Sequence, residues 1–368
     1  MNNKRIYLSP PNVDQEELDH ITAALESGWV APAGPLIDQF ESNLSSMLGR
    51  EALALNSGTS ALHLALILSG VRDRDRVLIG SHTFAACANV VLYERAVPVF
   101  LDSERETWNL DPATLEAYLE NTDEKPKALI VTHIYGMPAQ IEKICEIAKD
   151  YDVKVIEDAA ESLGATVNRR QVGTFGDFGV LSFNGNKIIT TSAGGALICS
   201  KEDKVRGMHL ATQANSDQFG YDHKEAGYNY RMSNVLAAIG VSQLKKLESY
   251  IAVKRIIYKR YKAELNNHFH FPNEPMNHQS NRWLSTALTL DSSKDMQSLC
   301  SCLDENNIEA RRFWKPLHMH DAYASAEFVG KGVCERLYES GICLPSGTGM
   351  TEQEQLYVIE KVKDWLDQ

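Results

Sequence analysis

Short, wholly apolar runs alternate with segments of helical periodicity between about residues 52 and 200, and this alternation constrains the fold most strongly. Strands that are apolar along their whole length belong in a sheet that is covered on both faces. Strand–helix alternation makes such a sheet mainly parallel, so the sequence predicts a large α/β domain. The runs are ALALN (52–56), RVLIG (76–80), PVFLD (98–102), ALIVTH (128–133) and KVIED (154–158), followed by FGVLSF (178–183) and GALICS (195–200).

The remainder of the chain predicts a smaller α+β domain. One long helix is expected from about Ser233 to Asn266, interrupted only at Gly240. We therefore divide the chain into a large domain over residues 1–240 and a linking helix with a small C-terminal domain over 241–368. The first 30 residues or so are expected to pack on the small domain. Further strands are expected at 283–291, 309–314 and 342–346, and further helices at 295–307 and from Glu352.

Composition excludes several classes of function. The chain has 37 Lys and Arg against 49 Asp and Glu, a net charge of −12, and it lacks the basic character that binding to nucleic acid needs. Seven cysteines without a CxxC pair predict neither a disulfide framework nor a zinc site, and no metal is expected. The start, MNNKRIYLSPPN, has no apolar leader, and no run of about 18 apolar residues occurs. A cytoplasmic protein without a membrane partner is the simplest interpretation.

The segment NSGTSALHLAL (56–66) places a turn of small residues between a buried strand and a helix. Free backbone N–H groups at the start of a helix converge on one spot, with the positive end of the helix dipole behind them, so the turn predicts an anion site. The hydroxyls of Thr59 and Ser60 add donors. The segment has neither the lysine of a P-loop nor the spacing of a dinucleotide-binding fingerprint. An ordinary helix cap is the alternative.

Two residues that could carry chemistry follow later strands. Asp158 ends a buried strand, where parallel sheets place their ligands. A carboxylate buried there needs a cation or several donors, and the protonated nitrogen of a pyridine ring is one such cation. Lys187 follows an apolar strand, and loss of hydration would suit its amine to imine formation; Ser182 could donate to a phosphate. A helix cap for Asp158 and a surface position for Lys187 are the alternatives.

The chain thus offers a phosphate turn, an aromatic side chain, an acid and a lysine in that order. The aromatic is Phe84, at the start of the helix after the second strand, where it could stack on a flat ring; burial in the core is the alternative. With this set, the sequence resembles the sugar-nucleotide aminotransferases of the type I, aspartate-aminotransferase-like, pyridoxal-phosphate fold. The resemblance covers nearly the whole chain, from LSPPN (8–12) and WVAPAGP (29–35) to WKPLH (314–318) and LPSG (344–347).

The resemblance implies pyridoxal 5′-phosphate as cofactor, with pyridoxamine 5′-phosphate as its second form. It implies a Schiff base at Lys187, Asp158 on the pyridine nitrogen, Phe84 over the ring and Glu161 near the ring hydroxyl. The phosphate would be held by Gly58, Thr59, Ser60 and Ser182.

The resemblance also implies a homodimer. The stretch GYNYRMSN (227–234) matches a family segment whose asparagine, here Asn229, reaches the phosphate of the neighbouring subunit. The two active sites of such a dimer would be shared. A local role for Asn229, capping the turn before the next helix, is the alternative.

Departures from the common family pattern narrow the expected substrate. Asn184, Gly185 and Asn186 stand where many relatives carry an aromatic or histidine and a proline, and the acid that is common after the lysine is missing from TTSAGG. With SNRWL (280–284), these features are more similar to the subgroup that aminates C4 of UDP-linked 4-keto-6-deoxy-N-acetylhexosamines. The donor would be L-glutamate, leaving as 2-oxoglutarate. Amination at C3, a dTDP- or GDP-linked sugar, and a non-catalytic cofactor-binding regulator stay open.

The diphosphate of such a substrate needs cationic or donor groups, and the smaller domain offers five. For each of them singly, a solvated surface charge is the alternative. The candidates are Arg282, Arg311, Arg312, Lys315 and His318.

Overall fold

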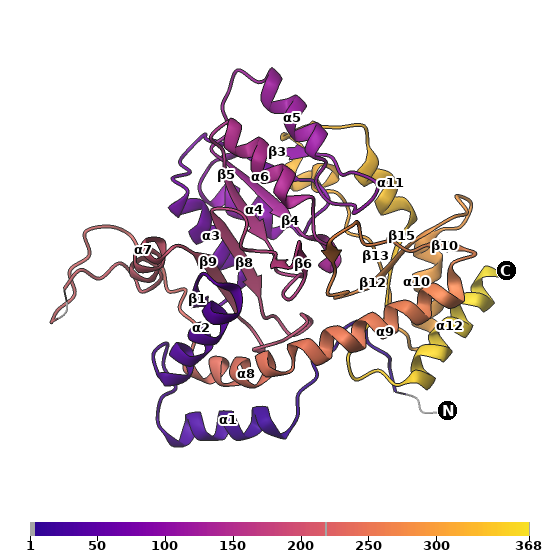
Figure 1. Ribbon diagram of the computed structural model, residues 1–368, viewed down its shortest axis with the longest axis horizontal. Helices are drawn as coiled ribbons and strands as arrows, with labels where there is room; N and C mark the ends of the chain where they lie inside the picture. The colour runs from indigo at the N-terminus through magenta and orange to yellow at the C-terminus, as the bar shows by residue number, and fades with distance from the viewer. Residues whose placement is uncertain (1–3, 218, 368) are drawn as a thin grey trace.

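The computed structural model describes residues 4–217 and 219–367. Its centre is an eight-stranded sheet in the order β1-β9-β8-β5-β4-β2-β3-β14 (Figure 1). Neighbours from β8 to β14 are parallel, whereas β9 runs antiparallel to both β1 and β8. The mainly parallel central sheet expected from the sequence is therefore confirmed. The strands are β1 (Glu51–Leu55), β2 (Arg76–Gly80), β3 (Val97–Leu101), β4 (Ala128–Thr132), β5 (Lys154–Asp158), β8 (Phe178–Ser182), β9 (Gly195–Cys199) and β14 (Glu327–Val329).

Helices cover both faces of this sheet, which explains why its strands are apolar throughout. Successive side chains of a strand point to opposite faces. In β4, Leu129 and Val131 belong to one core cluster, and Ile130 belongs to the other. The covering helices are α2 (Pro35–Leu48), α3 (Gly58–Leu68), α4 (Ala86–Tyr93), α5 (Pro112–Asn121), α6 (Ile141–Asp150) and α7 (Lys201–Ala211).

The C-terminal part forms a second core around an antiparallel sheet in the order β10-β12-β15-β13. One segment of this part leaves the second sheet, because β14 pairs with β3 at the edge of the large sheet. Small strands β6 (Thr166–Val167), β7 (Arg170–Gln171) and β11 (His278–Gln279) form a third sheet. The second sheet comprises β10 (Phe269–His270), β12 (Ser285–Thr289), β13 (Arg311–Arg312) and β15 (Gly341–Leu344), with helices α10 (Met296–Glu305), α11 (Val333–Ser340) and α12 (Glu352–Leu366) beside it.

The N-terminal residues divide between the two parts. Ile6 pairs with Ile308 of the C-terminal part. Helix α1 (Gln15–Glu26) instead packs on α8 (Asn234–Lys245), where Gln243 donates to Glu17 at 2.8 Å. Residues 6–8 therefore contact the C-terminal part, whereas α1 contacts α8.

The single helix expected over 233–266 is wrong, because two helices meet at Lys246. They are α8 and α9 (Leu247–Leu265). The Lys246 ammonium is fixed at the junction by the Glu17 carboxylate of α1, at 2.7 Å. Gly240, the expected interruption, lies inside α8, where a Cβ atom would approach the Phe40 ring to 2.8 Å. The glycine therefore serves the close packing of α8 on α2 rather than a break.

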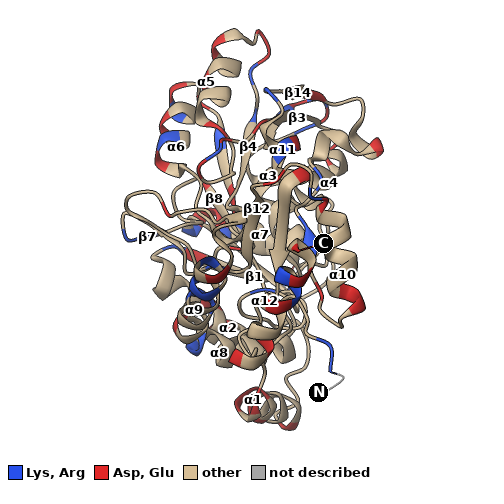
Figure 2. Ribbon diagram, turned by 90° about the vertical axis from the view of Figure 1, so that its right-hand side faces the viewer, with Lys and Arg blue, Asp and Glu red and all other residues tan. Residues whose placement is uncertain are grey.

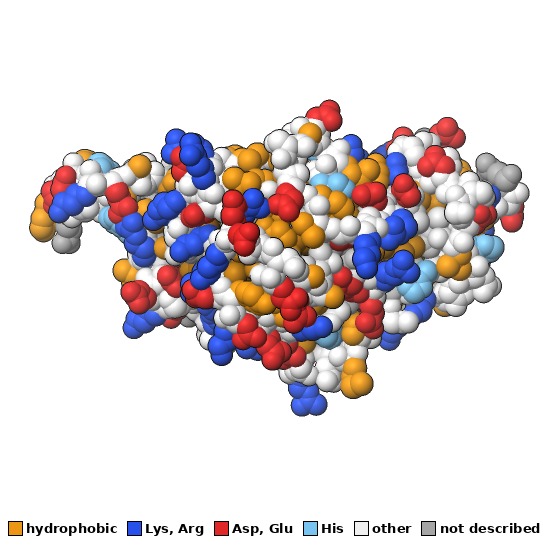
Figure 3. Space-filling view, turned by 90° about the horizontal axis from the view of Figure 1, so that it is seen from above, with side chains coloured by type: hydrophobic (Ala, Val, Ile, Leu, Met, Phe, Trp, Pro, Cys, Tyr) orange, Lys and Arg blue, Asp and Glu red, His pale blue; other side chains and the backbone are white. Residues whose placement is uncertain are grey.

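Charged residues lie along several of the outer helices, whereas α3 and α4 carry none. Acidic and basic residues are mixed along α6, α9 and α12 (Figure 2). Seen from above, basic and acidic groups lie next to one another with apolar groups between them (Figure 3). Within residues 4–217 and 219–367, no helix has the length and apolar character needed to cross a bilayer. The same part of the chain contains no group of three His, Cys, Asp or Glu placed to hold a metal.

Candidate active site

A cavity of about 320 Å³ lies at the carboxyl ends of the parallel strands, where α/β sheets bind ligands. The turn at the start of α3, the ends of β4 and β5, and the segments after β8 form most of its wall. Two tryptophans from the C-terminal half, Trp283 and Trp314, complete it. Seven residues singled out from the sequence line this one cavity: Gly58, Thr59, Phe84, Asp158, Glu161, Ser182 and Lys187.

The turn before α3 presses against the end of β8. A Cβ atom on Gly58 would lie 3.1 Å from Ser182 Cβ, so glycine allows the helix start to reach Ser182. Ser57 is the N-cap and accepts the Ser60 N–H at 3.0 Å. Thr59 lines the cavity, whereas Ser60 does not. Ser60 is buried, and its hydroxyl donates to the Asn56 side-chain oxygen at 2.6 Å. Of the two hydroxyls that this turn offers to a phosphate, that of Thr59 lies at the cavity wall and that of Ser60 does not.

Asp158 is buried at the end of β5 and is oriented by two donors. The Ala160 N–H donates to Oδ1 at 3.1 Å, and the Cys87 thiol donates to Oδ2 at 3.0 Å. Burial, and after it the charge of Asp158, raises the pKa of Cys87 well above its usual value, so the thiol keeps its proton. The chain after Asp158 forms turns rather than a helix, so Asp158 caps none. Cys87, in the first turn of α4, was missed because a lone cysteine carries no sequence signal.

Lys187 lies inside the cavity rather than at the surface. Its Nζ is 3.5 Å from Oε1 of Glu161 and 4.3 Å from the centroid of the Trp283 ring. The other Glu161 oxygen accepts the Tyr135 N–H at 2.6 Å. Burial raises the pKa of Glu161 to about 7, against the opposing effect of the nearby Lys187 charge. The lysine thus has an acidic partner and an aromatic platform.

Phe84 is not a core residue. Its side chain is 58% exposed, and its ring centroid lies 5.4 Å from that of Trp314. The ring lines the cavity from the segment before α4 and is free to contact a ligand.

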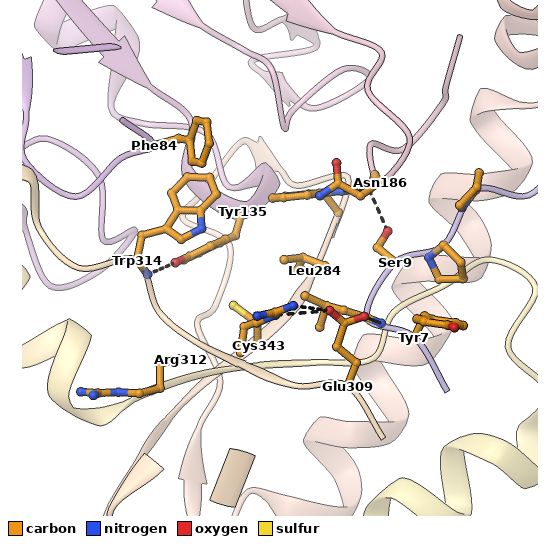
Figure 4. A pocket seen from close by; sticks show the side chains of 15 residues that line it. Tyr7, Ser9, Phe84, Tyr135, Asn186, Leu284, Glu309, Arg312, Trp314 and Cys343 are labelled. Atoms are coloured by element: carbon orange, nitrogen blue, oxygen red, sulfur yellow. Dashed lines mark hydrogen bonds and ion pairs between the residues drawn. The ribbon is translucent and has the colours of Figure 1, made fainter. Parts of the chain in front are cut away.

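A second, outer cavity has a volume of about 670 Å³, and Figure 4 shows the side chains that line it. The two share Phe84, Asn186, Trp283 and Trp314 in their walls. The wall of the outer cavity also contains residues 7–11 of the N-terminal segment. The two tryptophans occur in the segments SNRWL and WKPLH, but nothing local to either segment marked them as site residues.

Two of the five basic candidates line this outer cavity. Arg311 is exposed and pairs with Glu309 at 2.8 Å. Arg312 also lines it, although its guanidinium lies over the ring of Tyr338, 4.1 Å from the centroid. In Figure 4 the Arg312 side chain extends away from the other labelled groups.

The other three basic candidates line neither cavity. The buried Arg282 guanidinium stacks on Tyr258, 3.7 Å from the ring centroid. Nδ1 of His318 is 2.7 Å from the Ser81 hydroxyl, and its ring stacks on Phe328. Tertiary partners therefore direct Arg282 and His318 away from both cavities, and Lys315 lies outside both walls.

Asn229 lies beside the end of β1 in its own chain. Its carbonyl accepts the Asn56 amide at 3.1 Å, and Arg231 bridges to Leu55. The Asn229 side chain is exposed, and it is outside the wall of the 320 Å³ cavity as described for one chain.

Comparisons with known proteins agree with this architecture. The sequence profile of the DegT/DnrJ/EryC1/StrS aminotransferase family matches residues 11–363. Similar proteins include EpsN of Bacillus subtilis (strain 168), 47% identical over 97% of this chain and 95% of EpsN. GDP-perosamine synthase of Escherichia coli O157:H7 is 33% identical over 98% of this chain and 99% of that protein.

Solved structures give the same result. The aminotransferase TlmJ from Streptoalloteichus hindustanus superposes with a TM-score of 0.91 and 27% identity, covering 98% of this chain and 99% of TlmJ. A DegT/DnrJ/EryC1/StrS aminotransferase from Brucella abortus has a TM-score of 0.88 and 27% identity, covering 95% of each chain. The type I aminotransferase fold, with its smaller C-terminal domain, is confirmed. The chain belongs to the DegT/DnrJ/EryC1/StrS aminotransferase family.

Proposed function

We propose that this protein is a pyridoxal-phosphate-dependent aminotransferase that moves the amino group of L-glutamate to a nucleotide-linked ketosugar. The observation that carries the proposal is the convergence of Lys187, Asp158 and the start of α3 on one cavity. An amine, a buried carboxylate and a helix N-terminus match the aldehyde, ring nitrogen and phosphate of that cofactor. EpsN is named as an aminotransferase dependent on pyridoxal phosphate, which supports this assignment.

The residues of the cavity fit a flat ring with a phosphate. Thr59 and Ser182 lie in the wall of the cavity, beside the start of α3, where the first N–H groups of the helix can bind a phosphate. The missing Cβ of Gly58 leaves room where the helix start and Ser182 meet. Phe84 offers an exposed ring for stacking. Glu161, with a pKa of about 7, is suited to share a proton with a ring hydroxyl.

When bound, pyridoxal phosphate supplies the electron-withdrawing ring that stabilises negative charge at the reacting carbon. Asp158, held by the Cys87 thiol and the Ala160 N–H, keeps a proton on the ring nitrogen through its opposite charge. The Lys187 amine removes and returns the proton at the substrate carbon as general base and acid. Glu161, 3.5 Å away, orients that amine. Because one lysine serves both halves of the transfer, ping-pong kinetics are expected.

The outer cavity supports a substrate larger than an amino acid. Its volume of about 670 Å³ and its four residues shared with the inner cavity allow a sugar at the lysine and a nucleotide beyond it. We infer that the sugar is a UDP-linked 4-keto-6-deoxy-N-acetylhexosamine that is aminated at C4. The inference rests on the departures from the common family pattern at 184–186 and on the segment SNRWL (280–284). A Campylobacter jejuni protein, 33% identical over 72% of this chain, is named UDP-4-amino-4,6-dideoxy-N-acetyl-beta-L-altrosamine transaminase.

A GDP-linked ketosugar is the second candidate. The relatives named GDP-perosamine synthase, from Escherichia coli O157:H7 and Caulobacter vibrioides, are 33% and 34% identical and cover 98% and 99% of this chain. Both candidates use the same lysine, so they differ only in what the outer cavity accepts.

We also propose a homodimer with shared active sites. The described residues between α7 and α8, 212–217 and 219–233, include a part that projects from the body of the chain (Figure 1). Phe219 and Tyr221 on it are 94% and 90% exposed. Large exposed aromatics on a projecting segment fit a surface that a second copy covers. In such an assembly Asn229 would contribute to the neighbour's phosphate site.

A half-reaction screen tests the proposed function. Protein loaded with pyridoxamine phosphate is mixed in turn with UDP-, GDP- and dTDP-linked ketosugars, and the absorbance of the cofactor is followed. The UDP-linked 4-ketosugar should return the cofactor to its aldehyde form fastest, and L-glutamate should reverse the change. The fastest return with a GDP-linked sugar would favour the second candidate. A protein that responds to none of the three overturns the nucleotide-sugar assignment.

A further inference from the structure

Helix α9 carries a lysine that is enclosed in the protein interior. Lys254 is 2% exposed. Its Nζ donates to the carbonyl oxygens of Trp283 at 3.0 Å and Ser346 at 2.7 Å, and it lies 3.5 Å from the Ser9 hydroxyl. Among residues 4–217 and 219–367, no carboxylate forms an ion pair with it. These partners come from three segments far apart in the sequence, so one side chain joins them.

A cation in such a place is costly, because a buried charge loses its hydration. Burial lowers the pKa of Lys254 to about 7. An apolar side chain of similar length would fill the same space without this cost. The feature that distinguishes Lys254 from such a side chain is the set of groups that its ammonium holds.

Both Ser9 and Trp283 act on the residue before Lys187. The Ser9 hydroxyl donates to the Asn186 carbonyl at 3.0 Å, and the Trp283 indole N–H donates to the same oxygen at 2.7 Å. The Ser9–Asn186 bond lies at the edge of the outer cavity (Figure 4). The ring of Trp283 also faces the Lys187 ammonium, at 4.3 Å. Lys254 is thus two contacts away from Lys187 by either route.

The same contacts hold the N-terminal segment in the wall of the outer cavity. The Ser346 N–H donates to the Leu8 carbonyl at 2.7 Å, and the Leu8 N–H donates to Glu309 at 3.1 Å. Residues 7–11 form part of that wall. Lys254 binds the segment at Ser9 and also binds Ser346. The Lys254 ammonium therefore contacts Ser9, in the wall of the outer cavity, and Trp283, in the walls of both cavities.

We propose that Lys254 is a positioning residue, whose ammonium fixes Trp283 and residues 7–11 against the Asn186 carbonyl and thereby places the Lys187 amine. The role of Lys187 rests on the proposed function. The coupling of Lys254 to residues 7–11 and to 183–187 does not depend on a bound cofactor. The coupling and the proposed function can therefore fail separately.

The test compares Lys254→Met, which removes the donors, with Lys254→Arg, which keeps a charged donor. Lys259→Met, at an exposed lysine of the same helix, is the matched control. Ser9→Ala breaks one link and leaves the buried charge in place. Hydrogen exchange is measured on the purified proteins, with and without pyridoxal phosphate, for peptides that cover 6–11, 183–187 and, as a reference, α6.

Lys254→Met should speed exchange in 6–11 and 183–187 by about tenfold, the effect of losing a buried hydrogen bond, and leave α6 unchanged. Ser9→Ala should give a smaller change of the same kind, and Lys254→Arg should restore part of the protection. In loaded protein, Lys254→Met and Ser9→Ala should both shift the pH at which the absorbance of the attached cofactor changes, and Lys259→Met should not.

Unchanged exchange in both segments of folded Lys254→Met would overturn the proposal. If Lys254→Met does not fold, wild-type exchange at 183–187 in Ser9→Ala overturns it instead. If the exchange changes as expected but wild-type protein takes up no cofactor, the coupling stands and the proposed function fails.

Discussion

The Nζ atom of Lys187 lies 3.5 Å from Oε1 of Glu161, and the Glu161 side chain is only 3% exposed. The second Glu161 oxygen accepts the Tyr135 N–H, so the carboxyl has little freedom to turn. Burial raises the pKa of Glu161 to about 7. The charge beside Lys187 therefore changes near neutral pH, where a lysine that moves protons is sensitive to it.

Glu161→Gln should remove a pH-dependent part of the stability of the apoprotein. The pKa of Glu161 is about 7 in the folded chain against an ordinary 4.5, so the folded state binds more protons between these values. Stability should then fall as pH rises from about 4.5 to about 7, by at most about 1.4 kcal/mol per pH unit. Urea unfolding across this range measures the difference between wild type and variant. A difference that does not change with pH would contradict the raised pKa.

Thr59→Val should weaken the binding of pyridoxal phosphate by roughly 10- to 100-fold, because a hydrogen bond to a charged group contributes about 1.5–3 kcal/mol. Ser60→Ala should have a smaller effect, since the Ser60 hydroxyl is already bound to Asn56. Quenching of the fluorescence of Trp283 and Trp314, which line the cavity, measures the affinity. Thr22→Val, at an exposed threonine of α1, is the control. A larger loss for Ser60→Ala than for Thr59→Val would reverse our assignment of the two hydroxyls.

Arg311→Gln should raise the KM for the nucleotide sugar and leave the KM for L-glutamate nearly unchanged, because Arg311 lines only the outer cavity. Arg282→Gln should instead lower the free energy of unfolding, because the Arg282 guanidinium is buried over Tyr258. Steady-state kinetics with each substrate varied, together with urea unfolding, separate the two effects. Equal increases in both KM values for Arg311→Gln would place the diphosphate in another pocket.

The sequence predicted the large-domain half of the site because that half depends on local pattern. A buried strand must end where its apolar run ends, and in a parallel sheet these ends lie at one edge. Asp158 and Ser182 end their strands and the turn at 57–59 follows β1, and the structure places all of them around one cavity. The observed strand bounds differ from the expected ones by only a residue or two, because each strand follows its own apolar run.

The other half of the site was beyond sequence reasoning, because it depends on contacts between distant segments. Trp283 reaches the Asn186 carbonyl across the junction of the two parts, and no periodicity near either residue indicates this. The basic candidates show the same difficulty. Arg282 and Arg311 have equal charge in the sequence, yet one stacks on Tyr258 in the interior and the other lines a cavity.

The proposed dimer predicts complementation between two inactive variants. Lys187→Ala removes the amine of one site, and Asn229→Ala removes a phosphate donor that we assign to the neighbouring site. In a mixed dimer one site carries both changes and the other neither, so activity should reappear as subunits exchange. Verified heterodimers without recovered activity would show that each site lies within one chain. Asn229→Ala with full activity by itself would show that this side chain is not needed.

The central claim is that the Lys187 amine is the group that bonds to the cofactor. The protein is loaded with pyridoxal phosphate, reduced with borohydride to make the bond permanent, digested, and mapped by mass spectrometry. We predict that the phosphopyridoxyl group is found on Lys187, and that Lys187→Ala carries none and has lost its turnover. A label on another lysine, such as Lys254, or a Lys187→Ala protein with normal turnover, would contradict the account.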